Sequence, residues 1–289
     1  MEKKLRVGFL HSLIRKDEKT LLDELRKRED IEVVMINDRQ VEFTIGQKSF
    51  DVDCVLERSI NHSRAVHAIQ IFESIGIPCF NSGKVATICG DKLLTSITLA
   101  KAKVPQPEVR VAFTEESALS SIEKMGYPVV LKPAVGSWGR LLSKVNDKEA
   151  AEAILEHKKV LGSYHHSIYY IQKYVDKAGG RDIRAFVIGD EVIAAIYRNS
   201  EHWITNTSRG GVAVNCPITK ELKEICLNTA KAIGGGMLGI DVFETQGKLL
   251  INEVNYTMEF KNSIDTTGVN IPQKMVDYVV SQMKKLSKN

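Results

Sequence analysis

The chain has 289 residues, a formal net charge of +4 at pH 7, 43% hydrophobic residues and 26% charged residues. These values are ordinary for a globular protein, and the length predicts two or three compact units. The excess of 40 basic over 36 acidic residues is too small to indicate nucleic-acid binding. No apolar stretch reaches the roughly 20 residues that a membrane span needs, and the first residues lack a signal-peptide pattern. Composition therefore predicts a cytoplasmic protein without nucleic-acid or membrane partners.

The reactive side chains that many enzymes use show no recognisable pattern. The five cysteines are scattered, odd in number and without a C-x-x-C pair, which fits reduced thiols better than disulfides or a zinc site. His62, His165 and His166 are isolated and are expected at the surface. Motifs with a nucleophilic serine or a zinc-binding histidine pair are absent from the sequence. Any catalysis is therefore expected to be electrostatic, without a protein nucleophile.

Strand and helix patterns alternate over roughly the first 90 residues. Strands are predicted at 5–10, 31–36 and 53–56, and helices at 17–29, 62–75 and about 84–102. This alternation predicts a parallel sheet with helices on both faces. The prolines at 105 and 107 end the last helix and form the first candidate domain boundary.

The pattern changes after these prolines. Strands are predicted at 109–113, 128–133, 141–145 and 168–175, with helices at 115–124 and from Asp147, as N-cap, to about 160. Beyond a turn-rich segment at 177–180, strand 182–188 is expected to pair with 191–198, and strand 239–244 with 248–254. Helices near 220–233 and 272–286 are expected to pack on this antiparallel unit. The fold class is therefore a combination of α/β and α+β.

Two carboxylates interrupt the apolar strands of the last predicted hairpin. Asp241 and Glu253 would be costly there without a partner, and Asn255 projects from the same strand face as Glu253. Such oxygen donors suit Mg²⁺. A two-residue turn would place the two carboxylates on opposite faces, so we predict a three-residue turn or an equivalent bulge that aligns them. An edge hairpin with exposed acids is the less favoured alternative.

Several cations precede this hairpin. Lys132 lies in an apolar strand, where its ammonium needs an anion or water, and Lys92 begins a helical segment. Arg184 and Arg198 fall on neighbouring strands and should repel unless an anion, phosphate or carboxylate, separates them. The loop 136–140 can form an anion-binding nest, although taken alone it is more typical of a plain hairpin turn.

The order of these parts resembles the ATP-grasp ligases. It runs from Lys92 through V-V-L-K-P, G-S-W-G-R, I-Q-K-Y-V and R-D-I-R-A-F-V-I-G to N-T-S-R-G-G, G-I-D-V-F-E and I-N-E-V-N. Within that superfamily the chain is similar to the RimK-like branch, and its segment E-V-N-Y-T-M-E-F-K-N-S at 253–263 is most similar to the α-aminoadipate–LysW ligase family. The resemblance implies the ATP-grasp fold: an N-terminal α/β (pre-ATP-grasp) domain at 1–91, a small central lobe at 92–178 and a larger C-terminal antiparallel lobe at 179–289.

The resemblance also implies a site for ATP and two Mg²⁺ ions between the last two lobes. The residues implied to bind nucleotide are Lys92, Lys132, Gly136, Ser137, Trp138, Gly139, Arg140, Gln172, Lys173, Tyr174, Val175, Asp182, Arg198 and Asn206. Asp241, Glu253 and Asn255 would bind the metal ions, and Arg184, Arg198 and Asn206 would act in catalysis. Arg58, Arg184, Thr207, Glu259, Phe260, Lys261, Asn262 and Ser263 would contact the substrates. The implied reaction converts a carboxylate into an acyl phosphate, which an amine then attacks.

In the resembled family the amine belongs to α-aminoadipate and the carboxylate to the C-terminal glutamate of an acidic carrier protein, LysW, in lysine biosynthesis. The family also suggests a homo-oligomer, a dimer or a tetramer. We expect Asn followed by Thr or Ala in aminoadipate ligases, and Gly-Phe in the glutamate–carrier ligases of arginine synthesis. Asn262 supports aminoadipate, while Ser263 departs from the pattern and leaves dual use open. A RimK-like protein glutamate ligase and a non-catalytic nucleotide-binding scaffold are the remaining alternatives.

Overall fold

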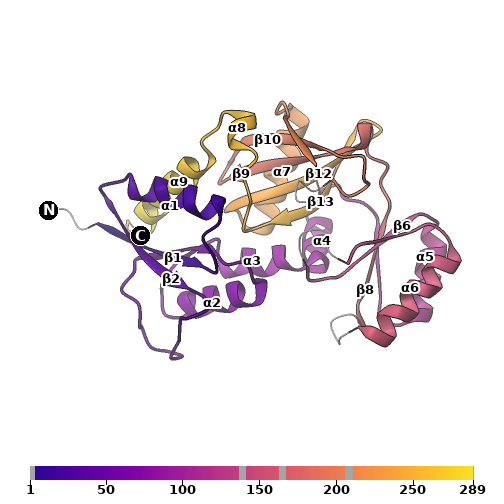
Figure 1. Ribbon diagram of the computed structural model, residues 1–289, viewed down its shortest axis with the longest axis horizontal. Helices are drawn as coiled ribbons and strands as arrows, with labels where there is room; N and C mark the ends of the chain where they lie inside the picture. The colour runs from indigo at the N-terminus through magenta and orange to yellow at the C-terminus, as the bar shows by residue number, and fades with distance from the viewer. Residues whose placement is uncertain (1–3, 137–140, 163–166, 206–210, 289) are drawn as a thin grey trace.

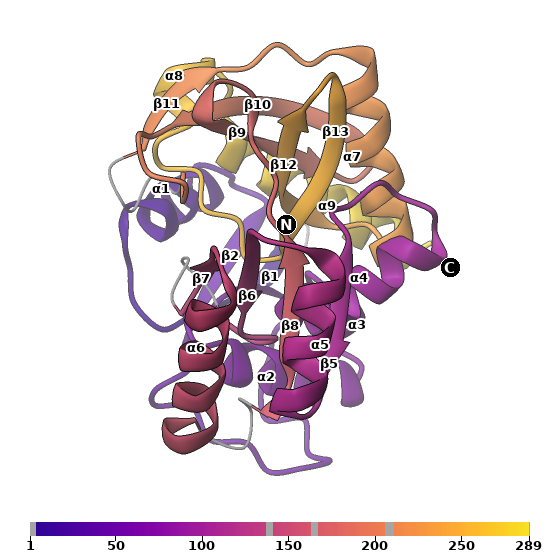
Figure 2. The ribbon, with the colours of Figure 1, turned by 90° about the vertical axis from the view of Figure 1, so that its right-hand side faces the viewer.

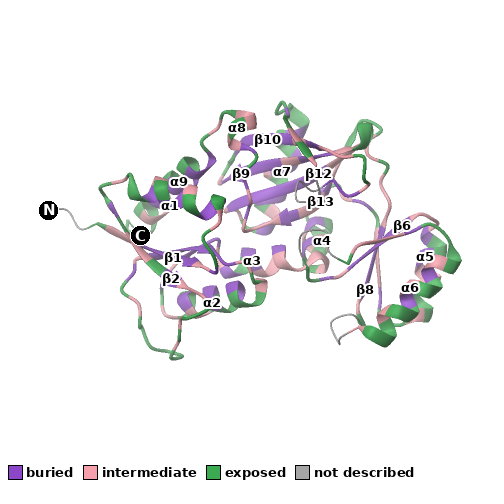
Figure 3. Cartoon of the chain, viewed as in Figure 1, coloured by how far each residue is buried: buried purple, intermediate pink, exposed green. Residues whose placement is uncertain are grey.

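The computed structural model describes residues 4–136, 141–162, 167–205 and 211–288, which form three β-sheets with flanking helices. A parallel sheet and a five-stranded antiparallel sheet lie side by side, and a second antiparallel sheet lies at one end of the molecule (Figure 1). Buried residues follow the strands, while the outer faces of the helices are exposed (Figure 3). No helix of the described residues has the length and hydrophobicity to span a bilayer. The mixed α/β and α+β class is thus confirmed.

The N-terminal sheet is parallel, as the alternating pattern predicts. Its strands are β1 (Leu5–His11), β2 (Ile31–Asn37), β3 (Cys54–Arg58) and the short β4 (Cys79–Phe80), in the order β2-β1-β3-β4. Helix α1 (Lys16–Arg26) packs on one face of this sheet and helix α2 (His62–Ser74) on the other. Successive residues of β1 point to opposite faces, so Phe9 belongs to the hydrophobic cluster of α1 and Leu10 to that of α2.

The single helix expected at about 84–102 is wrong, because the chain breaks at Asp91 into α3 (Gly83–Gly90) and α4 (Lys92–Lys101). Asp91 is extended, with φ −122° and ψ 116°, and its carboxylate caps α4 by accepting from Leu93 N at 2.7 Å. The main chain also bridges Asp91 to Val135, and Lys92 N donates to Ala134 O at 2.8 Å. These tertiary contacts interrupt the helix and place Lys92 at the start of α4, beside the segment that enters the loop 136–140.

The central unit contains a four-stranded antiparallel sheet covered by two helices. Its order is β5 (Val109–Ala112), β8 (Tyr169–Lys173), β6 (Val129–Lys132) and β7 (Ser143–Val145), with α5 (Glu115–Met125) and α6 (Lys148–Leu161) packed together beside it (Figure 2). Asp147 caps α6 as predicted, with its Oδ1 accepting from Ala150 N at 2.8 Å. The polar ends of β6 and β8 leave this core and face the C-terminal sheet.

The C-terminal sheet has five antiparallel strands, two of which form the predicted acidic hairpin. After a short 3₁₀ turn (Ala178–Gly180), the order is β11 (Val212–Asn215), β10 (Glu191–Asn199), β9 (Arg181–Ile188), β12 (Met237–Thr245) and β13 (Lys248–Asn255). Helix α7 (Lys220–Ile233) packs on one face, and the short α8 (Ile264–Thr267) lies near β10 and β11. Helix α9 (Ile271–Leu286) joins the other face to α1 in one continuous core with the N-terminal sheet.

Candidate active site

Two adjoining pockets lie on the C-terminal sheet. The central pocket, of about 60 Å³, is between this sheet and strands β6 and β8, and includes Lys132, Gln172 and Phe243. The N-terminal pocket, of about 210 Å³, is between the same sheet and the ends of the N-terminal strands. Gly136 and Glu253 line both pockets. A ligand in one pocket therefore lies next to a ligand in the other.

The acidic hairpin aligns its two carboxylates by a bulge. The turn has two residues, Gln246 and Gly247, both with positive φ (46° and 72°), so the three-residue turn is not what forms. Val242 pairs with Ile251, but Asp241 pairs with Glu253, which leaves Asn252 as an inserted residue. This is the equivalent bulge that we predicted, and it places Asp241 directly opposite Glu253 on the same sheet face.

The arginine pair is separated by carboxylates of the protein itself. Arg184 Nε and Nη2 donate to Asp241 at 2.5 and 3.0 Å, and Arg198 donates to Asp182 through two bonds of 2.7 Å. Arg198 Nη2 also lies 3.2 Å from Asp241 Oδ2. Burial opposes ionisation of Asp241, yet both guanidiniums outweigh it and lower the pKa of this carboxyl. For Arg198, burial alone would lower the pKa, but Asp241 and Asp182 raise it. The cluster is thus fully charged and internally neutralised.

Two lysines of the central pocket contact the bulge at Asn252 and Glu253. Lys132 is 6% exposed, and its Nζ donates to Asn252 Oδ1 at 2.8 Å. Burial lowers the pKa of Lys132 to about 8, although Glu253 counteracts this effect. Lys92 Nζ lies 3.1 Å from Glu253 Oε1 and donates to Gly136 O at 2.7 Å. Two consecutive residues of the bulge therefore each contact one lysine: Asn252 contacts Lys132, and Glu253 contacts Lys92.

The other end of the central pocket has the residues of the predicted nucleotide hinge. Gln172, Tyr174 and Val175 line it, with Asp182 and the aromatic ring of Phe243. The side chain of Lys173 is directed elsewhere, because its Nζ donates to the carbonyls of Met125 and Gly126 at 2.8 and 3.1 Å. The central pocket therefore combines apolar and aromatic side chains at this end with the two lysines at the other.

The N-terminal pocket receives most of the residues expected to contact the substrates. Glu259, Lys261, Asn262 and Ser263 line it together with Arg184. Arg58 and Phe260 do not line it: both are 1% exposed, and the Arg58 guanidinium donates to Glu18 and to Met258 O behind the pocket. Six predicted site residues, Ser137, Trp138, Gly139, Arg140, Asn206 and Thr207, lie outside the described residues.

Sequence reasoning missed several residues that line these pockets, and four of them are polar or charged groups with a clear place in the site. His62 is half-buried rather than a surface residue, and its Nδ1 is 2.9 Å from the hydroxyl of Tyr256 in the N-terminal pocket. Asn252 had a signal, since consecutive polar residues interrupt an apolar strand there. Arg15 follows the carboxyl end of the first parallel strand, where ligands often bind. Lys177 lines the central pocket and had no signal in its turn-rich segment.

The donor chemistry of the hairpin fits a hard divalent cation. Asp241, Glu253 and Asn255 all line the N-terminal pocket, and all offer oxygen atoms. No group of three or more His, Cys, Asp or Glu side chains suited to a metal occurs among the described residues. The oxygen-rich set with one amide favours Mg²⁺ over a transition metal.

The three sheets, with two lysines at the central pocket and an acidic hairpin at the N-terminal pocket, are the arrangement of an ATP-grasp ligase. Residues 89–279 match the RimK-like ATP-grasp domain, and residues 7–88 match the LysX preATP-grasp domain. The chain therefore belongs to the RimK-like ATP-grasp ligase family. Enzymes of this family bind ATP and typically Mg²⁺.

Individual relatives agree with this assignment. The chain is 37% identical over 246 residues to the alpha-aminoadipate–LysW ligase LysX of Saccharolobus solfataricus, covering 84% of this chain and 88% of that protein. It is 33% identical to the glutamate–LysW ligase ArgX of Sulfolobus acidocaldarius, covering 95% and 98%. The crystal structure of a RimK domain ATP-grasp protein from Sphaerobacter thermophilus superposes with a TM-score of 0.79 at 25% identity, covering 94% and 98%.

Proposed function

We propose that this enzyme joins the amino group of α-aminoadipate to the side-chain carboxylate of the C-terminal glutamate of a LysW-type carrier protein. The product is an amide (isopeptide) bond, and the reaction belongs to lysine biosynthesis. The observation that carries the choice of amino acid is the presence of Asn262 in the N-terminal pocket, adjoining the proposed phosphate site. The aminoadipate–LysW ligase among the relatives supports the same choice.

In this proposal ATP occupies the central pocket. Its adenine lies between the hinge residues Gln172–Val175 and Phe243, and its phosphates meet Lys132 and Lys92. The remaining nucleotide contacts are proposed for Asp182 and Arg198 and, outside the described residues, for Ser137, Trp138, Gly139, Arg140 and Asn206. Two Mg²⁺ ions held by Asp241, Glu253 and Asn255 would neutralise phosphate charge.

The chemistry uses the cations of the two pockets in two steps. An oxygen of the carrier's carboxylate forms a bond to the γ-phosphorus as the bond to ADP breaks, which gives an acyl phosphate. The neutral amine then adds to the acyl carbon, phosphate leaves, and the amine proton is released. Arg184 and Arg198 stabilise the negative charge that develops in both steps. For this, Arg184 must exchange part of its bond to Asp241 for the reacting oxygens.

Two larger features remain part of the proposal. The lobes are those at 1–91, 92–178 and 179–289, of which the first and third share one core, with the nucleotide between the second and third. The enzyme acts as a homo-oligomer, and an acidic carrier docks near the basic residues of the N-terminal pocket. Added salt should therefore weaken carrier binding.

Mass spectrometry of the carrier tests the proposed reaction. Purified LysW, ATP and Mg²⁺ are incubated with the enzyme and either α-aminoadipate or glutamate. We expect a mass increase equal to aminoadipate minus water, with one ADP released per modified carrier. A carrier of unchanged mass, or ADP release independent of the carrier, would reject it and favour a RimK-like ligase for another protein or a nucleotide-binding scaffold.

A second candidate function is the loading of glutamate, alone or in addition. Ser263 favours this alternative because it departs from the expected Thr or Ala, and the glutamate–LysW ligase relative covers nearly the whole chain. The double substitution Asn262→Gly with Ser263→Phe should shorten the pocket by roughly the methylene that distinguishes the two substrates. A preference ratio shifted toward glutamate by about 10–200-fold is expected. Asp265→Ala, at an exposed residue that does not line the pocket, is the control.

A further inference from the structure

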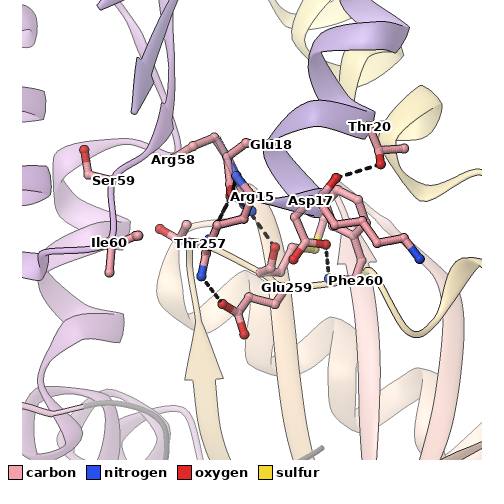
Figure 4. A network of polar contacts seen from close by, with 12 residues as sticks. Arg15, Asp17, Glu18, Thr20, Arg58, Ser59, Ile60, Thr257, Glu259 and Phe260 are labelled. Atoms are coloured by element: carbon pink, nitrogen blue, oxygen red, sulfur yellow. Dashed lines mark hydrogen bonds and ion pairs between the residues drawn. The ribbon is translucent and has the colours of Figure 1, made fainter. Parts of the chain in front are cut away.

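Arg15 brings a guanidinium from the N-terminal unit into the N-terminal pocket. It directly precedes α1, lines the pocket and leaves 30% of its side chain exposed. Nε and Nη2 donate to Glu18 at 2.9 and 3.1 Å, and Nη1 donates to Glu259 at 2.6 Å (Figure 4). A guanidinium has five N–H groups. These three bonds therefore leave one N–H on Nη1 and one on Nη2 for a further acceptor.

The buried carboxylate of Glu18 holds this guanidinium in a fixed orientation. Glu18 is fully buried and is shared between Arg15 and Arg58, which is 1% exposed. Glu259, at 33% side-chain exposure, contacts Arg15 through one bond. With the buried Asp17 nearby, the carboxylates outnumber these two arginines, so Arg15 offers an entering carboxylate oriented N–H donors rather than surplus charge. A negative group entering the pocket meets a preorganised partner and need not order a flexible side chain.

Arg15 also has a fixed position relative to the segment that selects the amino acid. Four consecutive residues, 257–260, each bond to the N-terminal unit. Thr257 Oγ1 donates to Glu57 at 2.6 Å, Met258 O accepts from Arg58 at 3.0 Å, Glu259 pairs with Arg15, and Phe260 N donates to Asp17 at 3.0 Å. Asn262 and Ser263 follow directly on this tethered segment and line the same pocket. The N-terminal unit therefore forms part of the amino-acid site.

We propose that Arg15 binds a carboxylate group of the amino-acid substrate. The inference rests on the proposed function, because it takes the acceptor to be a dicarboxylic amino acid whose amine reacts. Neither carboxylate of that substrate reacts, so both need a stable cationic partner. Arg184 and Arg198, the other arginines of the pocket, are bonded to Asp241 and Asp182 and are assigned to the reacting oxygens in the proposed function. Arg15 has free donors on a rigid support, and this role replaces the one expected of Arg58.

Equilibrium binding to the full-length protein tests the assignment. Isothermal titration with Mg²⁺ and a non-hydrolysable ATP analogue is carried out for Arg15→Ala, Arg15→Lys and the control Arg28→Ala. Arg28 is a matched control, since it lies near the other end of α1, is 31% exposed and also pairs with two carboxylates, Asp30 and Asp277. We expect Arg15→Ala to raise the Kd for α-aminoadipate by about 10–100-fold, with Kd for the nucleotide unchanged. Lysine keeps the charge but has no planar guanidinium, so the Kd of Arg15→Lys for α-aminoadipate should lie between those of the wild type and Arg15→Ala.

Two substrate analogues separate recognition from a structural role. Norleucine lacks the side-chain carboxylate of α-aminoadipate, and 5-aminopentanoate lacks the α-carboxylate. If Arg15 binds one carboxylate, the Arg15→Ala penalty disappears for the analogue without that group and persists for the other. An equal penalty on both analogues, or a loss no greater than in Arg28→Ala, overturns the assignment. Because Arg15→Lys keeps the cation beside Glu18, it supplies a folded variant if Arg15→Ala loosens α1.

Together with the mass spectrometry of LysW, this titration separates the proposed function from the assignment of Arg15. A wild-type protein that binds aminoadipate but leaves LysW unmodified rejects the proposed function, and the Arg15 assignment is then decided by the binding arms alone. A wild-type protein that loads LysW, with Arg15→Ala binding aminoadipate as Arg28→Ala does, rejects only the assignment. A wild-type protein that binds none of these amino acids rejects both.

Discussion

Replacing Lys132 with methionine should stabilise the unliganded enzyme while it abolishes ATP binding. Lys132 is 6% exposed, and in the described residues the hydrogen-bond partner of its ammonium is Asn252 Oδ1 at 2.8 Å. Burial lowers the pKa of Lys132 from 10.5 to about 8 despite the nearby Glu253. The folded protein thus holds a charge that it disfavours. That charge is useful only when phosphate oxygens arrive.

The size of the effect follows from this pKa. A fall from 10.5 to about 8 corresponds to about 3 kcal/mol of disfavoured ammonium in the folded state. Methionine has a similar length and removes this cost, but it leaves Asn252 Oδ1 with only a long contact to Gln172 Nε2 at 3.4 Å, which costs about 1 kcal/mol. The net gain is about 2 kcal/mol, or a rise in Tm of about 3 °C for a protein of this size.

The gain must depend on pH with a definite sign. The unfolded chain keeps the lysine protonated up to its ordinary pKa, while the folded protein releases the proton near pH 8. The cost of the buried ammonium is therefore fully present below about pH 8 and falls as pH rises toward 10.5. The difference in Tm between variant and wild type should shrink over this interval. ATP should stabilise only the wild type.

Differential scanning calorimetry at pH 7 and pH 10, with and without Mg-ATP, measures these quantities. Lys148→Met, which removes a 61% exposed lysine paired with exposed acids, should leave Tm nearly unchanged. A Lys132→Met variant that melts at or below the wild type at pH 7 would refute the reasoning. So would a gain of equal size at both pH values.

Three further results are expected. Asp182→Ala should destabilise the protein by about 3–5 kcal/mol in urea unfolding, because it leaves the buried Arg198 with only Asp241, which Arg184 also shares; a loss below about 1 kcal/mol would contradict it. Gly90→Ala should impair folding or activity, since a Cβ there would lie 1.7 Å from His62 Cε1, and adding His62→Ala should restore folding by circular dichroism if this clash is the cause. Removal of Mg²⁺ with EDTA should abolish ADP formation and leave the circular dichroism spectrum unchanged; persistent ADP formation would argue against a metal at the hairpin.

Site residues could be predicted where a charged side chain interrupts an otherwise apolar strand. Asp241 and Glu253 break apolar strands, and Lys132 breaks another, so each signals a site from its position alone. Because side chains alternate between the two faces of a strand, a bulge or a three-residue turn was needed to bring the two carboxylates to the same face. The structure shows the bulge, at Asn252. Gln246-Gly247 suits a two-residue turn. The inserted Asn252 is bonded to Lys132, 120 residues away in the chain, a contact that the local sequence does not reveal.

Other features depended on distant partners and were missed or misread. The helix break at Asp91 requires the main-chain bridge to Val135, which local propensity does not reveal. His62 has an unremarkable helical context, yet it lies against Gly90 and Tyr256. Arg58 was favoured by its place at the end of a strand, but Glu18 holds its guanidinium behind the pocket.

Periodicity and charges that interrupt apolar strands are local properties, so the parallel N-terminal sheet, the two antiparallel hairpins and the charged residues of the site could be read from the sequence. Their ATP-grasp roles came from the family resemblance. Which cations face a ligand and which are neutralised inside the protein depends on the folded chain. Lys132 meets Asn252, Arg184 meets Asp241, and Arg15 rather than Arg58 reaches the N-terminal pocket. Desolvation and charge pairing depend on neighbours that are distant in the sequence: Lys132 and Asn252 are 120 residues apart, and Arg184 and Asp241 are 57 residues apart.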